Sequence, residues 1–135
     1  MRVDGDVVAE IGHGLLLLVG VGRDDDAAAA ERLAAKVARM RVFEDEASSF
    51  ALTLADVGGS ALAVSQFTLL ANSGRQKGTR PDFSQAAGRE QAEPIYEAFC
   101  TALRDEGFDV EMGVFGARME VELVNDGPVT LVLET

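Results

Sequence analysis

Cysteine and histidine, which often serve as nucleophiles, bases and metal ligands, are scarce in this chain. Its 135 residues contain one cysteine, Cys100, and one histidine, His13. A single cysteine excludes an internal disulfide bond, so we expect a reducing compartment, the cytoplasm. A zinc site would need mostly carboxylates, which is unusual, and we predict no metal and no cofactor. The longest apolar run, residues 15–19, is far too short to span a bilayer, so we expect no membrane partner.

Basic residues are also few. Twelve Lys and Arg against 23 Asp and Glu give a net charge of −11. Proteins that bind RNA through its phosphates usually present a basic face, so this balance counts against a nucleic-acid partner. The segment 72–80 is a local exception, because it holds Arg75, Lys77 and Arg80 and no acidic residue. On charge pattern alone, a solvated loop explains this segment better than an RNA contact does.

The hydrophobic pattern predicts one mixed α/β domain over residues 1–135, with the order ββαββαβββ. Residues 7–11 and 15–21 are apolar and β-branched, and Gly12-His13-Gly14 between them predicts a tight hairpin turn. Aspartates precede residues 27–40, where Leu33, Val37 and Met40 recur at helical spacing, so a helix is predicted there.

The second half of the chain predicts a helix over residues 90–106, with Pro94 in its first turn or at a kink and Gly107 at its C-terminal cap. A long polar loop over residues 70–84 precedes this helix, and loops of that length are often functional. The remaining predicted strands are residues 41–43, 61–69, 110–114, 119–124 and 129–134.

Two polar stretches could carry chemistry. Ser65-Gln66-Phe67-Thr68 ends an apolar strand with two hydroxyls and an amide, although a strand emerging into solvent explains it equally well. Asn125-Asp126-Gly127-Pro128-Val129-Thr130, taken alone, reads as an ordinary turn between strands. A Ser-His-Asp triad is not expected, because His13 lies in a predicted turn far in sequence from both stretches. Cys100 lies among apolar helix neighbours and is expected to be a core thiol.

Together and in this order, the two stretches resemble the signatures of the D-aminoacyl-tRNA deacylases, a Ser-Gln-Phe-Thr strand end and a C-terminal Asn-x-Gly-Pro-x-Thr segment. The resemblance covers essentially the whole chain. Further pieces in family order are Val3-Asp4-Gly5, Gly12-x-Gly14-Leu15, Arg41-Val42-Phe43-Glu44-Asp45, Asp56-Val57-Gly58-Gly59, Arg80-Pro81-x-Phe83-Ser84, Glu93-Pro94-x-Tyr96 and Phe115-Gly116-Ala117-x-Met119.

Two departures from the family pattern stand out. Members usually begin with a strand containing Gln-Arg-Val, whereas here Met1-Arg2 runs directly into Val3-Asp4-Gly5. We therefore expect the family's first strand to be lacking, through a misplaced start site or a true truncation. The arginine of that strand, which helps hold the Gly-Pro segment in the family, has only Arg2 as a candidate counterpart. The loop between Thr68 and Pro81 is also slightly longer than usual.

The resemblance implies a three-layer β/β/α domain and a homodimer with active sites at its interface. It assigns catalysis to Ser65, Gln66, Phe67 and Thr68, whose backbone N–H groups would stabilise an oxyanion. Either Thr68 is a nucleophile, or the 2′-OH of the terminal adenosine of tRNA organises the attacking water. We favour the second, because the sequence offers Thr68 no general base. Arg75, Lys77 and Arg80 become candidate tRNA contacts.

The resemblance also implies that Gly127 and Pro128 form a cis peptide that reaches into the partner's site, within a segment that includes Asn125 and Thr130. Its carbonyls would bind the substrate ammonium and leave no room for an L side chain. Glycyl-tRNA should then be accepted as well. Met119 and Phe115 match positions that line the family's pocket, although strand core explains each equally well.

The predicted function is hydrolysis of the ester of D-aminoacyl-tRNA, a chiral proofreading step in translation quality control. Three alternatives stay open: a tRNA-binding homologue that has lost activity with its first strand, a hydrolase of small acyl esters using Ser65 or Thr68 as nucleophile, and an editing module like that of some archaeal threonyl-tRNA synthetases.

Overall fold

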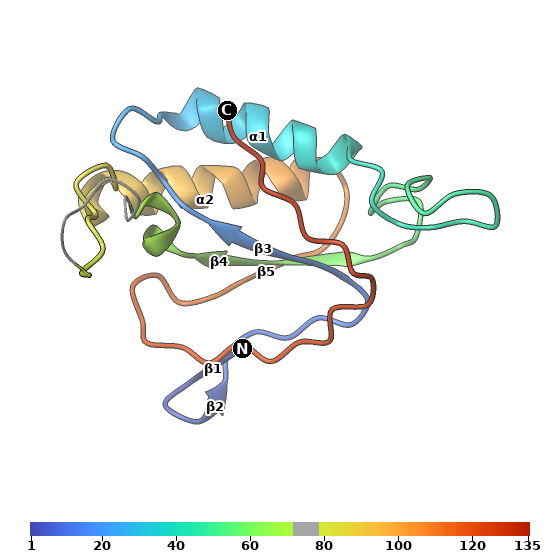
Figure 1. The fold of residues 1–135 in the computed structure, drawn as a ribbon, viewed down its shortest axis with the longest axis horizontal. Coiled ribbons are helices and arrows are strands. Elements are labelled where there is room, and N and C mark those ends of the chain that lie inside the picture. Colours follow the sequence, from blue (N-terminus) through green and yellow to red (C-terminus); the bar gives the residue numbers. More distant parts are fainter. Residues whose placement is uncertain (72–78) are drawn as a thin grey trace.

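The computed structural model describes residues 1–71 and 79–135, which are arranged in three layers (Figure 1). Two helices form the upper layer and a three-stranded sheet the middle one. The lower layer holds a small N-terminal sheet and the extended stretch that follows β5, and the last residues of the chain rise past the sheet toward the helix layer. The predicted β/β/α layering is therefore confirmed.

The middle sheet is parallel and has the order β3-β4-β5. Its strands are β3 (Gly14–Val19), β4 (Ser60–Ser65) and β5 (Val110–Met112). The register pairs Gly14 with Ser60 at one end and Val19 with Ser65 at the other. Because all three strands run the same way, their carboxyl ends meet at one edge of the sheet.

The predicted hairpin at residues 12–14 is wrong. The first strands, β1 (Arg2–Val3) and β2 (Asp6–Val7), pair only with each other in a separate antiparallel sheet, and β3 pairs with β4 instead. Gly14 is needed for close strand approach, since an added Cβ would lie 1.7 Å from the carbonyl oxygen of Ser60. Gly14 therefore reflects the packing of β3 against β4, which a turn pattern does not distinguish, whereas an added Cβ at Gly12 would meet no atom within 4 Å.

Both predicted helices are confirmed as α1 (Ala27–Arg39) and α2 (Arg89–Asp105). Asp26 caps α1, because its carboxylate accepts a hydrogen bond of 2.8 Å from the backbone N–H of Ala29. Pro94 lies inside α2. Gly107 follows the helix at φ +102°, a conformation that favours glycine. None of the helices in residues 1–71 and 79–135 is long and apolar enough to cross a membrane.

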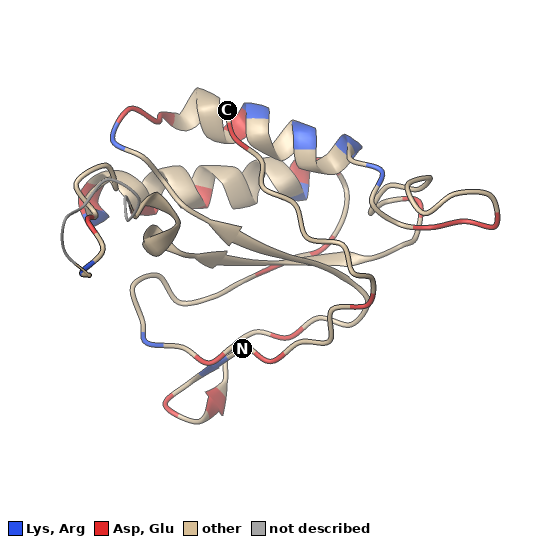
Figure 2. Cartoon of the chain, viewed as in Figure 1, with Lys and Arg blue, Asp and Glu red and all other residues tan. Residues whose placement is uncertain are grey.

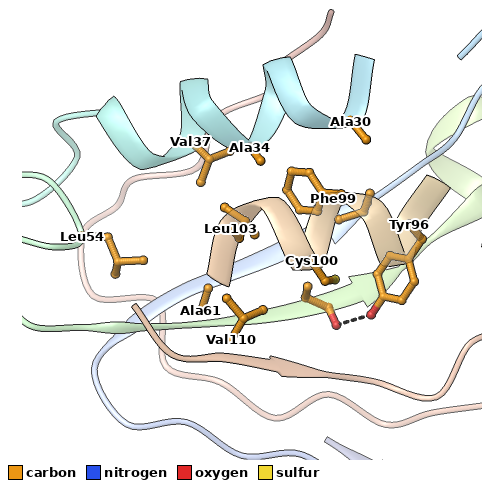
Figure 3. Close-up of a cluster of buried hydrophobic side chains, with 12 residues drawn as sticks. Ala30, Ala34, Val37, Leu54, Ala61, Tyr96, Phe99, Cys100, Leu103 and Val110 are labelled. Carbon is orange, nitrogen blue, oxygen red and sulfur yellow. Dashed lines mark hydrogen bonds between the residues drawn. The ribbon is translucent and has the colours of Figure 1, made fainter. Parts of the chain in front are cut away.

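Alternation along β4 gives the domain two cores. Ala61 and Ala63 belong to the core under the helices, together with Tyr96, Phe99 and Leu103 of α2 (Figure 3). The intervening Leu62 and Val64 belong to a second core, with Met1 and Ala9 of the lower layer. A strand with both faces covered is expected to be continuously apolar, as β4 is.

The C-terminal third departs from the prediction. Residues 119–124 and 129–134 form no strand, and the only ladder contact of this segment within the described residues is a single bridge between Arg2 and Glu120. The predicted strand 41–43 is likewise reduced to one bridge, between Phe43 and Leu52. Residues 119–134 have the apolar pattern of strands, but a strand requires a hydrogen-bonding partner, and among the described residues this segment pairs only at Glu120.

Candidate active site

The end of β4 turns sharply at the residues singled out by the sequence. The predicted strand 61–69 stops at Ser65, because the N–H of Gln66 donates the last bond to β3, 2.8 Å to the carbonyl of Val19. The chain then forms a short 3-10 helix, η1 (Phe67–Leu70). Polar residues fit here because the chain leaves the sheet at this point.

The first backbone N–H groups of a helix have no acceptor within it. In the described part of the chain, the amides of Phe67 and Thr68 have no hydrogen-bond acceptor. Two adjacent unsatisfied amides at the carboxyl end of a central parallel strand are well placed to bind a developing oxyanion. This pair is the main chemical feature of the site.

The side chains around the turn supply no obvious base. The Thr68 hydroxyl accepts a hydrogen bond of 2.5 Å from Nε2 of Gln66, and Thr68 is exposed. Phe67 is 58% exposed, with its ring 5.0 Å from that of Phe83 in an edge-on contact. Within residues 1–71 and 79–135, no titratable side chain is hydrogen-bonded to Thr68 or Ser65.

The single histidine lies at the opposite end of the sheet. The N–H of Ser60 donates to the carbonyl of His13, so His13 stands roughly 16 Å along β4 from Ser65. Its ring contacts Phe43. Cys100 is fully buried, and burial raises the pKa of its thiol to about 11. The structure therefore places neither residue at the turn, as the sequence predicted.

The second predicted stretch forms an exposed turn at residues 125–130. Its Gly127–Pro128 peptide is cis, as the resemblance implied. Nδ2 of Asn125 donates to Oγ1 of Thr130 across the turn, at 3.3 Å. Gly127 is tightly constrained, because an added Cβ would lie 2.2 Å from the backbone nitrogen of Val129.

One copy of the chain does not bring the two stretches together. Within the described residues, no hydrogen bond or ring contact joins residues 125–130 to residues 65–70. In Figure 1, η1 lies at the left end of the sheet, whereas the red C-terminal segment turns beyond its right end. If the two stretches share an active site, residues 125–130 must come from another copy.

The two predicted pocket residues lie in different layers. Met119 packs against the lower core beside Leu62 and Val64. Phe115 packs at the edge of the upper core, with its ring 5.9 Å from that of Tyr96 and the guanidinium of Arg89 5.6 Å from its centre. Each has a packing role in the single chain, and their predicted role in the pocket stays a prediction.

Of the candidate tRNA contacts, Arg80 is exposed, whereas Arg75 and Lys77 lie outside the described residues. A shallow polar depression of about 650 Å³ lies at the other end of the sheet, lined by residues such as Glu10, Arg104 and Asp109. Ligands of open parallel sheets bind at the carboxyl ends of the strands, so we assign this depression no role in the site. No group of three or more metal-ligating side chains converges within residues 1–71 and 79–135.

Sequence reasoning missed Gly20 and named Arg2 only as a candidate counterpart of the family's arginine. Gly20 lies beneath η1, since an added Cβ would lie 2.4 Å from Cδ2 of Leu70 and 3.3 Å from the carbonyl oxygen of Gln66. Arg2, only a guess before, forms an exposed ion pair of 2.8 Å with Glu122, which lowers the pKa of that carboxyl. It thus holds the segment that leads to residues 125–130. Neither the contact of Gly20 with η1 nor the ion pair of Arg2 with Glu122 could be predicted from neighbouring residues in the sequence.

Two backbone donors at a strand end can stabilise an oxyanion, which is what acyl-ester hydrolysis requires. Comparison with known proteins is more specific. The family model described as D-Tyr-tRNA(Tyr) deacylase matches residues 1–134, and the chain belongs to this family.

Its relatives are similar to it over the whole of this chain. The D-aminoacyl-tRNA deacylase of Anaeromyxobacter dehalogenans is 55% identical over 135 residues, which are 100% of this chain and 89% of the relative. That of Thermomicrobium roseum is 56% identical over the same length and is covered to 86%. A solved structure named c-Myc DNA Unwinding Element Binding Protein superposes with a TM-score of 0.87 at 38% identity, covering 99% of this chain and 90% of the other.

Proposed function

We propose that this enzyme hydrolyses the ester bond of D-aminoacyl-tRNA and releases the free D-amino acid and tRNA. The observation that carries the proposal is the pair of unsatisfied amides of Phe67 and Thr68 at the end of β4. Full-length relatives named D-aminoacyl-tRNA deacylase support the choice of substrate.

The chemistry needs few side chains. Water adds to the ester carbonyl carbon, the carbonyl oxygen becomes an oxyanion, and the Phe67 and Thr68 amides donate to it. Collapse of this intermediate breaks the bond to the 3′-oxygen, which takes up a proton and leaves as the tRNA 3′-OH. Loss of one oxyanion donor typically costs about a hundredfold or more in kcat.

The attacking water needs a partner, and within residues 1–71 and 79–135 no base is hydrogen-bonded to the exposed Thr68 hydroxyl to make it a nucleophile. We therefore assign orientation of the water to the adjacent 2′-OH of the terminal ribose. This assignment makes RNA part of the catalytic machinery, because a 2′-deoxy substrate lacks that group.

We further propose that the enzyme acts as a homodimer. Leu123, Val124, Leu131 and Val132 are between 53% and 93% exposed in one chain, and they lie on extended segments whose backbone has few ladder bonds. Extended apolar segments of this kind are suited to pair with another strand edge. A two-fold partner would bury them and could carry Gly127 and Pro128 to the other copy's η1.

The same arrangement accounts for selection by chirality. Gly127 has no side chain, so its backbone can approach the α-carbon of the substrate. We propose that carbonyls of this segment accept from the substrate ammonium and exclude an L side chain, with Asn125 and Thr130 holding the turn. Glycyl-tRNA has no side chain to exclude and is expected to be hydrolysed as well.

The decisive experiment is a deacylation time course with purified protein on matched D-tyrosyl-, L-tyrosyl- and glycyl-tRNA. We expect rapid release from the D- and glycyl-tRNA and little from L-tyrosyl-tRNA. A second D-tyrosyl substrate whose terminal ribose lacks the 2′-OH should react far more slowly. Tight tRNA binding without release of amino acid would favour the non-catalytic alternative, and equal release of D- and L-tyrosine would remove the chiral assignment.

A further inference from the structure

Although the protein is acidic overall, α1 carries a row of exposed basic side chains. Arg32, Lys36 and Arg39 are all exposed and appear as successive blue bands along this helix in Figure 2. Their spacing of four and three residues places them on one face, opposite the buried Ala34 and Val37. They extend over roughly 10 Å of the helix axis.

These three cations are not neutralised locally. None forms an ion pair in the described part of the chain, and residues 32–43 contain no Asp or Glu. Lys36 and Arg39 in the last turn also favour the helix dipole, which is worth a few tenths of a kcal/mol to about 1 kcal/mol for an exposed group. The dipole does not explain Arg32, which lies near the middle of the helix.

The helix that carries Arg32, Lys36 and Arg39 begins close to the candidate active site. Gly20 lies against η1, and the chain runs from there through Asp26 directly into α1. Arg32 therefore lies about one and a half turns along a helix that begins seven residues after Gly20, which packs against η1. A tRNA whose single-stranded 3′ end occupies η1 has its acceptor-stem phosphates at some distance from the ester, so phosphate contacts are expected away from the turn.

We propose that Arg32, Lys36 and Arg39 form the docking surface for the phosphate backbone of the tRNA acceptor stem. This inference rests on the proposed function. The candidate tRNA contacts in the loop before Pro81 are thereby joined by a second surface, on a helix. The negative net charge of the whole chain gave no sign of this basic surface. The contacts are to phosphates, so they contribute affinity and orientation without reading sequence.

The test compares two substrates and two sets of variants. The triple variant Arg32→Gln/Lys36→Gln/Arg39→Gln is assayed on D-tyrosyl-tRNA and on a D-tyrosyl ester of the isolated CCA trinucleotide. The control Ala47→Glu/Ser49→Glu lowers the net charge by a similar amount on an exposed loop. Steady-state kinetics are measured from about 50 to 200 mM salt, the range over which phosphate contacts weaken strongly.

We expect the triple variant to raise KM for the full tRNA by about tenfold or more at low salt, with kcat unchanged. The slope of log KM against log salt should decrease by roughly two to three, about one per lost phosphate contact. On the trinucleotide ester, variant and wild type should agree within twofold, and the control should resemble wild type on both substrates.

An unchanged KM and salt slope on full tRNA would overturn the proposal. An equal loss on both substrates would also overturn it, because it would mean that the helix acts on the site itself. A wild-type protein inactive on both substrates would instead refute the proposed function and is therefore distinguishable.

A second, independent observation concerns Tyr96, the only tyrosine of the chain. Its hydroxyl donates a hydrogen bond of 2.7 Å to the carbonyl of Ala63, drawn as a dashed line in Figure 3. The backbone N–H of Gly113 donates to the same carbonyl, at 3.0 Å. Both lone pairs of one carbonyl are thus used, which fixes the peptide plane two residues before Ser65.

The end of β4 beyond Ala63 has a hydrogen-bonded neighbour strand on one side only. Pairing with β5 ends at Ala63, whereas pairing with β3 continues to Ser65. Tyr96 is buried, and burial raises the pKa of its phenol, so it remains a donor at neutral pH. We infer that Tyr96 is a positioning residue, which sets the direction in which β4 delivers the Phe67 and Thr68 amides to the ester.

Tyr96→Phe removes the hydroxyl and retains the ring. We expect kcat on D-tyrosyl-tRNA to fall about tenfold with KM within twofold, since small misplacements in a site are costly. Leu103→Val is the control, because it loses stability in the same core without removing a hydrogen bond to the carbonyl of Ala63. Rates are normalised to the folded fraction from circular dichroism, and amide ¹⁵N shifts of residues 65–68 provide a readout independent of substrate.

A kcat for Tyr96→Phe equal to wild type, unchanged amide shifts at residues 65–68, or an equal loss of kcat in Leu103→Val would each overturn the positioning role. Failure of wild type to release D-tyrosine would again concern the proposed function only.

Discussion

Gly127→Ala and Thr68→Ala separate a backbone mechanism from a threonine nucleophile. At Gly127 an added Cβ would lie 2.2 Å from the nitrogen of Val129, whereas ordinary contact begins at 3.4 Å. The backbone must therefore shift by about 1 Å, and a displacement of that size in a site can cost about a hundredfold in rate. In free energy of activation this is roughly 2.7 kcal/mol.

If the proposed mechanism holds, Thr68→Ala lowers the activity much less than Gly127→Ala does. It deletes a hydroxyl whose hydrogen bond partner in the described residues is the exposed Gln66 amide, and it leaves the backbone N–H in place. We expect kcat/KM for D-tyrosyl-tRNA within about fivefold of wild type, because a hydrogen bond of this kind contributes about 1 kcal/mol.

The assay is a deacylation time course of both variants on D- and L-tyrosyl-tRNA. Gly12→Ala serves as the matched control, since its added Cβ has no heavy atom within 4 Å, and it should behave like wild type. Loss of all activity in Thr68→Ala together with a wild-type rate in Gly127→Ala would refute the backbone mechanism and favour Thr68 as nucleophile.

Three further predictions test the fold around the site. Gly20→Ala should lower kcat by tenfold or more, because its Cβ would collide with Leu70 and displace η1; deacylation kinetics with a circular dichroism control would check it, and a wild-type kcat would contradict it. Val124→Asp and Val132→Asp, at residues 93% and 86% exposed in one chain, should give inactive monomers by sedimentation and deacylation assay, and an active monomer at micromolar concentration would exclude a shared site. Cys100, with its pKa raised to about 11 by burial, should remain a protonated thiol at pH 8 and resist iodoacetamide until the protein unfolds, so rapid alkylation of the native protein, followed by mass spectrometry, would show that the core is open.

Local signals in the sequence were sufficient for the helices and for the motif positions. The aspartates before residue 27 and the apolar spacing after it specify a capped helix, because these effects act within one or two turns. The continuous apolar character of residues 61–64 similarly indicated a strand covered on both faces. The exclusion of His13 and Cys100 from the site also followed from the sequence, and the structure agrees with it.

Strand pairing could not be derived in the same way. Gly12-His13-Gly14 fits a hairpin turn and also fits a strand entering a parallel pair, and only the contact between Gly14 and Ser60 decides between them. Residues 119–134 have the alternation of strands, yet whether they form a ladder depends on an edge that lies elsewhere, on this chain or on another copy.

The sequence by itself determined the family motifs and the helices, but it extended the strand to residue 69 and so missed the turn after Ser65. The tertiary structure decided that this turn presents two unsatisfied amides, that Gly20 supports it from below, and that Tyr96 fixes the carbonyl of Ala63. The physical reason is the separation along the sequence of the residues that interact. Caps, turns and periodicity arise from neighbours within a few residues, whereas Tyr96 and Ala63 are 33 residues apart and meet only because α2 packs on the sheet.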